Sequence, residues 1–380
     1  MDDPSHNPIR VAECVLELLE EGRTSATYKQ AVLVALLDLC LEKTRANGSP
    51  PDSVTTRELA EKVISLYWPQ VRIWSDAEAD AKGRILVQNK SGRATEQGGG
   101  ILALIHDFRR IAEAASGRSA SLWSARSQHQ TAWEQLVHDV EWTLIEMPLP
   151  KLQRIGSHDM PWLYEIPWDD GANKPRRGDV RAYQQGRGGP FQNVVRLRPG
   201  VGRALQQLNG LLRPFVLQHW SDQVARMNRL SATRLPEFLF GADREALSPV
   251  RAGLLRLQEG RCFYCARAIA SAAEVDHFLP WSRHPDNALH NLVVADAACN
   301  GDKRDFLASA RHVARWRERN GSREGTLADL ARGLDWEAGS ERILGTARAV
   351  YAQVPEDGRL WEASRTFVAP DRGVIERALA

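Results

Sequence analysis

The sequence has little of what membrane-spanning, disulfide-stabilised and disordered chains are built from. It contains five cysteines in 380 residues. Its most apolar segment, 31–41, is interrupted by Asp38 and is much shorter than the roughly 18 residues that a membrane span needs. The first twenty residues hold five acidic side chains and lack the basic-then-apolar order of a secretory signal. Hydrophobic residues make up 43% at a mean hydropathy of −0.40, which is typical of globular proteins. We therefore expect a cytoplasmic, multidomain protein that does not contact membranes.

The net charge is also small, but charge is distributed unevenly along the chain. The formal net charge is +2, whereas residues 1–170 carry 18 basic against 25 acidic side chains and residues 171–234 carry 12 against 2. Such a local excess of positive charge favours an anionic partner, and nucleic acid is the first candidate. Alternatively, these arginines pair with the acidic N-terminal part and only hold two domains together. The arginines expected to contact nucleic acid are Arg176, Arg177, Arg181, Arg196 and Arg198.

Changes in composition and periodicity divide the chain into four segments. A Pro-rich break at 147–150 ends a helical first part, in which a plain helical bundle fits the pattern better than a winged-helix arrangement. The residues that follow are rich in Pro, Gly, Trp and Arg. The expected segments are a helical N-terminal domain at 1–147, a basic irregular or β segment plus a helix at 148–235, a cysteine-bearing domain at 236–320 and a C-terminal helical extension at 321–380.

Helix positions follow from apolar residues that recur in three- and four-residue steps. Thr55 and Glu58 have the spacing of a capping box, which predicts a helix start. Pro214 should kink the helix that carries Phe215 and Trp220, and both aromatic side chains are expected in the core. The helices predicted in this way span 28–41, 101–115, 130–145, 201–227, 248–259 and 306–318.

Three of the cysteines, Cys262, Cys265 and Cys299, lie within 38 residues. The C-x-x-C pair forms a tight turn that can present two thiolates to one ion. In a cytosolic chain, such a pair with a distant third cysteine indicates a metal or redox site rather than a disulfide framework.

Polar residues occur in a distinctive order around these cysteines. Asp276 and His277 are adjacent in a strand-like piece, Asn291 leads into a second apolar strand, and Asn300 follows the third cysteine directly. This segment, 261–305, resembles the HNH, or ββα-metal, nuclease family, in which two strands and a helix hold one divalent metal. The resemblance implies a small α+β nuclease domain within a mainly α multidomain protein.

The resemblance gives each motif residue a role. His277 corresponds to the general base, Asp276 to the metal-binding carboxylate, and Asn291 to the central Asn that holds the base in place. Asn300 takes the last motif position and would be the second metal ligand, which makes this an H-N-N variant. Mg²⁺ or Mn²⁺ is the implied ion, since both prefer oxygen ligands. Because adjacent side chains of a strand point to opposite faces, a bend at 276–277 is expected to bring both to the metal.

These residue types suit the hydrolysis of a phosphodiester. The reaction needs an activated water, neutralisation of the phosphate charge and stabilisation of the leaving oxygen. A neutral imidazole such as that of His277 can accept the proton of the water near pH 7. Lys303 and Arg304, at the expected start of the next helix, are expected to contact phosphate.

The cysteines suggest a second, structural metal. Zinc-bearing HNH domains commonly use two C-x-x-C pairs, and Asp296 stands three residues before Cys299, where the second pair would begin. A Zn²⁺ held by Cys262, Cys265, Asp296 and Cys299 fits this pattern, and three thiolates with a water are the alternative. The reserve ligands are His284 and His290.

Other chemistries fit the sequence less well. A nucleobase deaminase needs H-x-E and P-C-x-x-C, and neither motif is present. A non-catalytic zinc-binding DNA-binding protein explains the cysteines and the basic segment, but not Asp276, His277 and Asn300. We therefore predict a metal-dependent endonuclease acting on DNA, with restriction or anti-phage defence as the expected setting and mobile-element nucleases as the competing one. Whether a partner protein activates it is left open.

Overall fold

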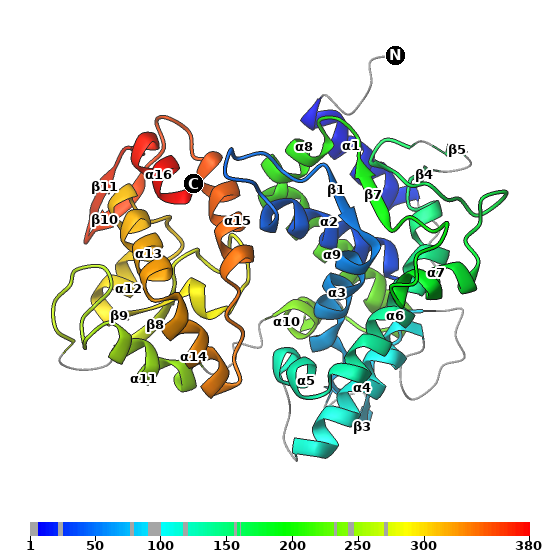
Figure 1. Cartoon of the computed structure of the whole chain (residues 1–380), viewed down its shortest axis with the longest axis horizontal. Coiled ribbons are helices and arrows are strands. Elements are labelled where there is room, and N and C mark those ends of the chain that lie inside the picture. Colours follow the sequence, from blue (N-terminus) through cyan, green and yellow to red (C-terminus); the bar gives the residue numbers. More distant parts are fainter. Residues whose placement is uncertain are drawn as a thin grey trace. The chain divides into compact units, whose positions relative to one another are not determined.

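A computed structural model describes residues 7–21, 26–76, 80–89, 100–116, 121–155, 158–159, 161–231, 234–241, 247–269 and 273–380. Most of these residues are helical, as predicted for a mainly α protein (Figure 1). The chain forms two compact units: unit 1 comprises residues 1–40 and 51–241, and unit 2 comprises residues 41–50 and 242–380. None of the described helices is long and apolar enough to cross a membrane.

Unit 1 is built around one hydrophobic core, whose members extend from Val11 to Leu239. The boundary expected at residue 147 therefore does not separate two bodies, because residues on both sides of it are buried together. Its elements are α1 (Pro8–Glu21), α2 (Tyr28–Glu42, whose last two residues belong to unit 2), β1 (Ser53–Thr55), α3 (Thr56–Tyr67), η2 (Trp68–Val71), β2 (Trp74–Asp76), β3 (Asp80–Arg84), α4 (Gly100–Ser116), α5 (Leu122–Gln128), α6 (Gln130–Glu146), η3 (Leu149–Lys151), β4 (Arg154–Ile155), β5 (His158–Asp159), β6 (Tyr164–Glu165), α7 (Arg177–Gln184), β7 (Val194–Leu197), α8 (Val201–Gln207), α9 (Asn209–Asn228) and α10 (Leu235–Phe240).

The helix α2 lies at the centre of this core. Residues 31–41 are all buried, which explains why the helix is apolar on every side. Asp38 is the charged exception, and Arg213 of α9 neutralises it, with 2.8 Å between Arg213 Nε and Asp38 Oδ1. A buried carboxylate is tolerated only with such a partner. One arginine of the basic segment therefore neutralises a buried carboxylate in the core of unit 1.

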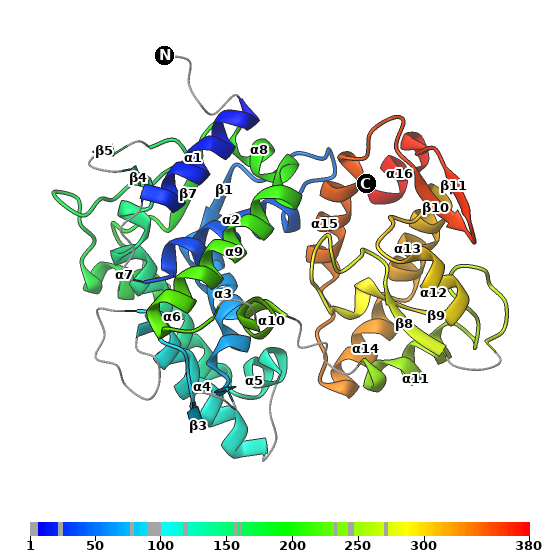
Figure 2. The same cartoon turned by 180° about the vertical axis from the view of Figure 1, so that it is seen from behind.

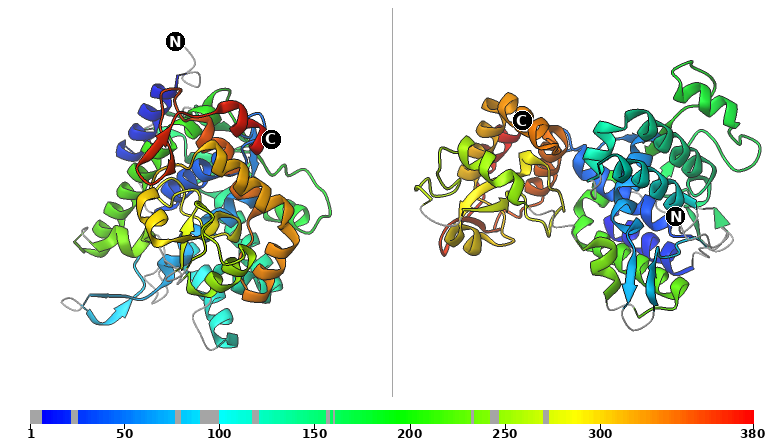
Figure 3. Two further views of the ribbon diagram at one scale, coloured as in Figure 1. Left: turned by 90° about the vertical axis from the view of Figure 1, so that its left-hand side faces the viewer. Right: turned by 90° about the horizontal axis from the view of Figure 1, so that it is seen from below.

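A small antiparallel sheet joins the first part of the chain to the basic segment. β7 lies between β1 and β6, with Val195 opposite Val54. Figure 2 shows β1 and β7 side by side. Thr55 ends β1 and forms the predicted capping box with Glu58 at the start of α3. β2 and β3 form a hairpin that projects from the helices (Figure 3) and does not pair with β1, so the described strands do not build the sheet of a winged-helix domain.

Two expectations for the basic segment are wrong. The helix predicted over 201–227 is two helices, which meet at Leu208, where φ of −96° and ψ of 5° leave the helical region. Pro214 lies inside α9, the helix that also carries Phe215 and Trp220. Trp220 is fully buried as predicted, but Phe215 is 40% exposed and does not belong to the core. The helix α7 was not predicted, because it is only eight residues long and buries a single apolar side chain, that of Val180.

Unit 2 combines the cysteine-bearing segment with the C-terminal residues. Trp361 packs in one cluster with Phe278, so the boundary expected at residue 320 falls inside this unit. The helix predicted over 306–318 begins only at Ala310, because residues 307–309 pair with β10 instead. The elements are α11 (Ser248–Leu257), β8 (Ala273–His277), η5 (Leu289–Asn291), β9 (Leu292–Asp296), α12 (Ala297–Lys303), α13 (Ala310–Ser322), α14 (Glu324–Leu334), α15 (Ser340–Ala352), β10 (Leu360–Ala363), β11 (Thr366–Val368) and α16 (Arg372–Leu379).

A short piece from the N-terminal part of the chain, 41–50, belongs to unit 2. Its backbone packs closely on α15 because Gly345 has no side chain, and a Cβ there would collide with the carbonyl of Glu42. Glu42 Oε1 also lies 3.0 Å from Nε2 of His284, and both side chains are buried. Unit 2 is therefore discontinuous in sequence.

Beside this contact, Arg342 of α15 neutralises the buried Asp286, with 2.7 Å between Arg342 Nε and Asp286 Oδ2. We predict that Arg342→Met lowers the free energy of unfolding of unit 2 by roughly 2–4 kcal/mol, since Asp286 would stay buried without a counter-charge. Arg332→Met is the control, because its ion pair with Asp329 is exposed and should contribute about 0–1 kcal/mol. Urea unfolding of both variants measures the difference, and equal stability would contradict the prediction.

Candidate active site and metal centre

The motif residues lie on a β-hairpin and the helix that follows it. β8 and β9 are antiparallel, with Asp276 opposite Val293. Asp296, at the end of β9, pairs with Ala273 at the start of β8 and is also the N-cap of α12. α12 therefore starts beside the first residue of β8. Strand, strand and helix follow one another as the resemblance predicts.

Four metal-binding side chains come together at the start of α12: Cys262, Cys265, Asp296 and Cys299. One ligand atom from each lies within 4.8 Å of the others. Around a tetrahedral Zn²⁺, with Zn–S distances of about 2.3 Å, sulfur atoms lie roughly 3.8 Å apart. Three thiols and one carboxylate are donors that zinc accepts, so the residues present fit this ion. Burial raises the pKa of the Cys262 and Cys299 thiols, and a bound cation would stabilise the thiolates instead.

The two carboxylate oxygens of Asp296 have separate contacts. Oδ1 accepts the backbone N–H of Cys299 at 2.8 Å and so caps α12, while Oδ2 lies 3.2 Å from Cys265 Sγ. Burial opposes ionisation, but the hydrogen bonds from Cys299 and the thiols lower the pKa of Asp296 to about 2. An ionised oxygen thus lies among the thiols. The reserve ligands lie elsewhere: His284 contacts Glu42, and His290 Nδ1 contacts the carbonyl of Ala338.

Asp276 is buried, and one of its oxygens is held from two sides. Oδ2 accepts the Tyr264 hydroxyl at 2.5 Å and lies 3.0 Å from Lys303 Nζ. Oδ1 has no hydrogen bond to any residue that the structure describes. The carboxylate is therefore oriented by one oxygen, while the other is free to bind a ligand.

Lys303 and Arg304 differ from their predicted placement. They do not begin a helix, since α12 ends at Lys303 and Arg304 follows it with a positive φ of 48°. The ammonium of Lys303 is fully buried and also donates to the carbonyl of His277 at 2.9 Å, so it is not exposed to a phosphate at the surface. Arg304 is exposed, and its Nε donates to the carbonyl of Gly301 at 3.1 Å.

Asn300 is oriented by a residue that sequence analysis did not identify. Its Nδ2 donates to Glu274 Oε2 at 2.7 Å, which leaves the amide oxygen for another partner. Glu274 lies two residues before Asp276 and therefore on the same face of β8. This two-residue spacing was a usable signal in the sequence. Asp276 Oδ1 and Asn300 Oδ1 are hard oxygen donors of the type that Mg²⁺ or Mn²⁺ binds, and both side chains are oriented by a second group.

The side chains that contact His277 differ from those that contact Asp276. Its Nε2 lies 2.8 Å from Asn287 Oδ1, and its ring packs edge-on against Trp281, with 5.2 Å between ring centroids. Burial lowers the pKa of His277, so the neutral imidazole is favoured near pH 7. Asn287 was not predicted, because only the folded loop between β8 and β9 brings it to the imidazole.

Asn291 is fully buried and holds that loop closed. Its Oδ1 accepts the backbone N–H of Leu279 at 2.8 Å, and its Nδ2 donates to the carbonyls of Leu279 and Asp286 at 3.2 and 3.0 Å. Both ends of the loop that carries Asn287 are therefore attached to one side chain. Asn291 acts on the position of His277 through this loop.

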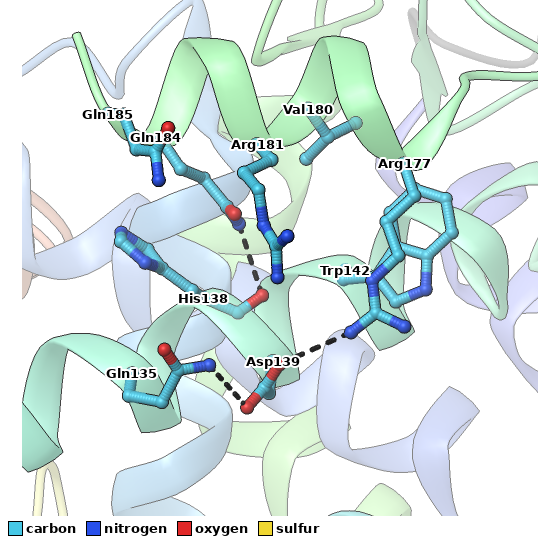
Figure 4. A pocket seen from close by; sticks show the side chains of 9 residues that line it. All are labelled: Gln135, His138, Asp139, Trp142, Arg177, Val180, Arg181, Gln184 and Gln185. Atoms are coloured by element: carbon cyan, nitrogen blue, oxygen red, sulfur yellow. Dashed lines mark hydrogen bonds and ion pairs between the residues drawn. The ribbon is translucent and has the colours of Figure 1, made fainter.

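The basic segment contributes a pocket in unit 1, between α6 and α7 (Figure 4). The pocket has a volume of about 120 Å³. The guanidinium of Arg177 lies over the ring of Trp142 and 3.5 Å from Asp139 Oδ1. Figure 4 shows Arg181 pointing into the pocket toward Asp139, and Arg181 has no ion pair with a described residue.

The other arginines of the interface predicted from the sequence are distributed over β7 and the ends of neighbouring elements. Arg198 pairs with Glu165 at 3.0 Å. Arg176 precedes α7, Arg196 lies on β7, and both are exposed. The alternative that these arginines form internal ion pairs therefore holds for part of the set only.

Two family models match the chain. Residues 262–309 match the model described as HNH endonuclease, so this part of unit 2 is an HNH nuclease domain. Residues 10–237, more than half of the chain, match the model described as "Domain of unknown function (DUF8808)", and the chain belongs to that family. No curated protein and no solved structure matches the chain. Residues 310–380 lie outside both matches.

We predict that Asn291→Ala destabilises the loop between β8 and β9, because three backbone groups would lose their partner in a buried place. The expected cost is roughly 2–4 kcal/mol. Asn173→Ala is the control, since Asn173 is exposed and bonded only to Asp169. Amide hydrogen exchange at residues 278–288 should become faster in the first variant and stay unchanged in the second. Unchanged exchange in both would show that Asn291 does not hold the loop.

Proposed function

We propose that the protein is a metal-dependent endonuclease that hydrolyses phosphodiester bonds of DNA in unit 2. The observation that carries the proposal is the orientation of Asp276 and Asn300. Tyr264 and Lys303 occupy one oxygen of Asp276, and Glu274 occupies the amide nitrogen of Asn300. Each side chain therefore keeps one oxygen available, as ligands supported by neighbouring groups do.

His277 is the proposed general base. Its neutral ring, with the Nε2 proton donated to Asn287 Oδ1, keeps Nδ1 as the nitrogen that accepts the proton of the attacking water. Asn291 keeps this arrangement by closing the loop that carries Asn287. Asp276 and Asn300 would hold Mg²⁺ or Mn²⁺, which supplies a positive charge to the phosphate and to the leaving oxygen.

Affinity for DNA is proposed to come largely from unit 1. Residues 250–320 carry 11 basic against 8 acidic side chains, a much smaller excess than that of residues 171–234. Phosphate contacts by exposed arginines provide affinity without reading sequence.

A role in restriction or anti-phage defence is supported by architecture alone, a nuclease unit joined to a second large unit, and is argued by analogy.

We predict that the full-length protein nicks plasmid DNA in Mg²⁺ or Mn²⁺ and not in EDTA, and that His277→Ala lowers the rate at least about 100-fold, the typical contribution of a general base. DNA affinity should not change. His106→Ala, on α4 in unit 1, is the matched control and should cut normally.

The metal assignment is tested in the same assay. Asp276→Ala and Asn300→Ala should lose cleavage in Mg²⁺, whereas Asp305→Ala, an exposed acid after α12, should not. Full activity of Asp276→Ala in Mg²⁺ would contradict the assignment. Normal DNA binding with no cleavage by the wild type would favour the non-catalytic zinc-binding alternative.

A structural zinc ion is proposed at Cys262, Cys265, Asp296 and Cys299. Elemental analysis should find zinc in the purified protein, and Cys299→Ser should lower the zinc content together with the melting temperature of unit 2, since metal binding and folding are coupled. Asp296→Asn keeps an oxygen that can cap α12 and should lower the zinc content with a smaller loss of stability. Wild-type protein without zinc would end this proposal.

The arginine assignment predicts a change in salt dependence. Replacing Arg176, Arg181 and Arg196 together by Gln should weaken DNA binding across sequences and flatten the slope of log affinity against log salt by up to roughly 2.7, about 0.9 per phosphate contact. Arg110→Gln, an exposed arginine of α4, controls for a general loss of charge. A lower melting temperature with an unchanged slope would favour the ion-pairing alternative.

A further inference from the structure

A β-hairpin near the C-terminus is attached to the helix that carries Asn300. β10 and β11 form this hairpin, and Asp302 Oδ2 of α12 accepts hydrogen bonds from Trp361 Nε1 at 2.8 Å and from the backbone N–H of Arg365 at 2.9 Å. The backbone of Trp361 also bonds to Leu307, in the chain that follows α12. The hairpin and the end of α12 are therefore one connected piece, although the HNH match ends at residue 309.

Two phenylalanines meet on the outside of this piece. Phe306, three residues after α12, is 46% exposed, and Phe367 of β11 is 36% exposed. Their ring centroids are 4.8 Å apart at an interplanar angle of 74°. Val368, the next residue of β11, is equally exposed, and all three residues of the strand lie at the surface. Exposed apolar side chains that meet on one surface indicate a contact with another molecule.

Both arginines and acids flank the pair: Arg304 and Arg365 are accompanied by Asp302 at the hairpin turn and by the exposed Asp305 directly before Phe306. Arg304 and Arg365 are both exposed, one between α12 and Phe306 and the other in the turn of the hairpin. Asp302 holds the turn that carries Arg365 through its backbone N–H, and Arg304 follows Asp302 by two residues, so both arginines lie close to the end of α12. Exposed aromatic rings between basic side chains are what nucleic acid contacts use, with rings against bases and charges against phosphates.

The distance to the proposed metal ligands is short. Lys303 follows Asn300 by three helical positions, a rise of about 4.5 Å. Phe306 follows Lys303 by three more residues. At no more than about 3.5 Å per residue over these last positions, the backbone of Phe306 lies within roughly 15 Å of that of Asn300. One bound duplex is long enough to span that distance.

We propose that Phe306 and Phe367 form a nucleic acid contact that packs against bases next to the cleaved bond, with Arg304 and Arg365 on the adjoining phosphates. The inference rests on the proposed function, because it takes DNA as the substrate. It adds an apolar contact, outside the motif, to the arginines of unit 1. A second copy of the chain fits this surface less well, because a symmetric pairing would bring the four arginines of two copies together.

The test uses full-length protein in the His277→Ala background, which should bind without cutting. The cut is first mapped with wild-type protein. The probe is duplex DNA that carries 2-aminopurine at successive positions around this cut. If no cut is found, 2-aminopurine is placed at successive positions along the whole duplex. The Phe306→Ala/Phe367→Ala protein should bind the duplex roughly 10-fold more weakly with the same salt slope, because it loses base contacts and no charge. The rise in 2-aminopurine fluorescence that reports unstacking should also disappear.

Three further variants make the result specific. Phe306→Leu/Phe367→Leu keeps the apolar surface without the rings and should bind nearly as weakly. Ile111→Ala is the control, an exposed apolar residue of α4 outside the basic segment, and should bind like the parent. Arg304→Gln/Arg365→Gln should flatten the salt slope by up to about 1.8. Melting temperatures check that each protein is folded.

Two results would overturn the inference. One is an unchanged affinity and fluorescence of the Phe306→Ala/Phe367→Ala protein. The other is a change of its oligomeric state with unchanged DNA affinity, which would make the surface an interface between copies. Failure of the proposed function is separate: wild-type protein would then not cleave, while the phenylalanine variants would still show whether the hairpin contacts DNA.

Discussion

The buried ammonium of Lys303 is the contact on which the arrangement of the site depends. It lies 3.0 Å from Asp276 Oδ2 and 2.9 Å from the carbonyl oxygen of His277, with no exposed surface. A buried cation persists only with such partners, so the end of α12 is fixed to the end of β8. Asp296 fixes the other end of the helix beside the start of β8. Asn300 lies between these two attachments, which fix its backbone, and Glu274 orients its amide.

Residues outside the HNH match support the segment that holds the base. The carbonyl of His290, directly before Asn291, accepts hydrogen bonds from Trp316, Arg319 and Asn320 of α13 at 2.8, 3.1 and 3.1 Å. Burial lowers the pKa of Arg319 to about 10, which still leaves the guanidinium charged at neutral pH. The motif alone is therefore not a complete folding unit: its central asparagine is positioned by a helix that follows it in sequence.

The positive charge of the basic segment is divided between the core and the surface of unit 1. Arg213 neutralises the buried Asp38, and Arg198 pairs with Glu165. Arg176 and Arg196 are exposed, and their charge is available to an anionic partner. The net charge counted from the sequence therefore overstates how much positive charge can contact a polyanion. Which arginines are available depends on whether an acidic side chain folds next to them.

The sequence by itself determined the features that depend on neighbours along the chain. The capping box at Thr55 follows from local spacing, and so does the order of Asp276 and the other motif residues, because these patterns act over a few residues. Only the tertiary structure decided that Lys303 points inward, that Asn287 meets the imidazole, and that residues 41–50 belong to the nuclease unit. Each of these depends on a contact between segments far apart in sequence or on the path of a loop. Local periodicity in the sequence encodes neither a long-range contact nor a loop path, because whether a side chain is buried depends on which distant segment packs against it.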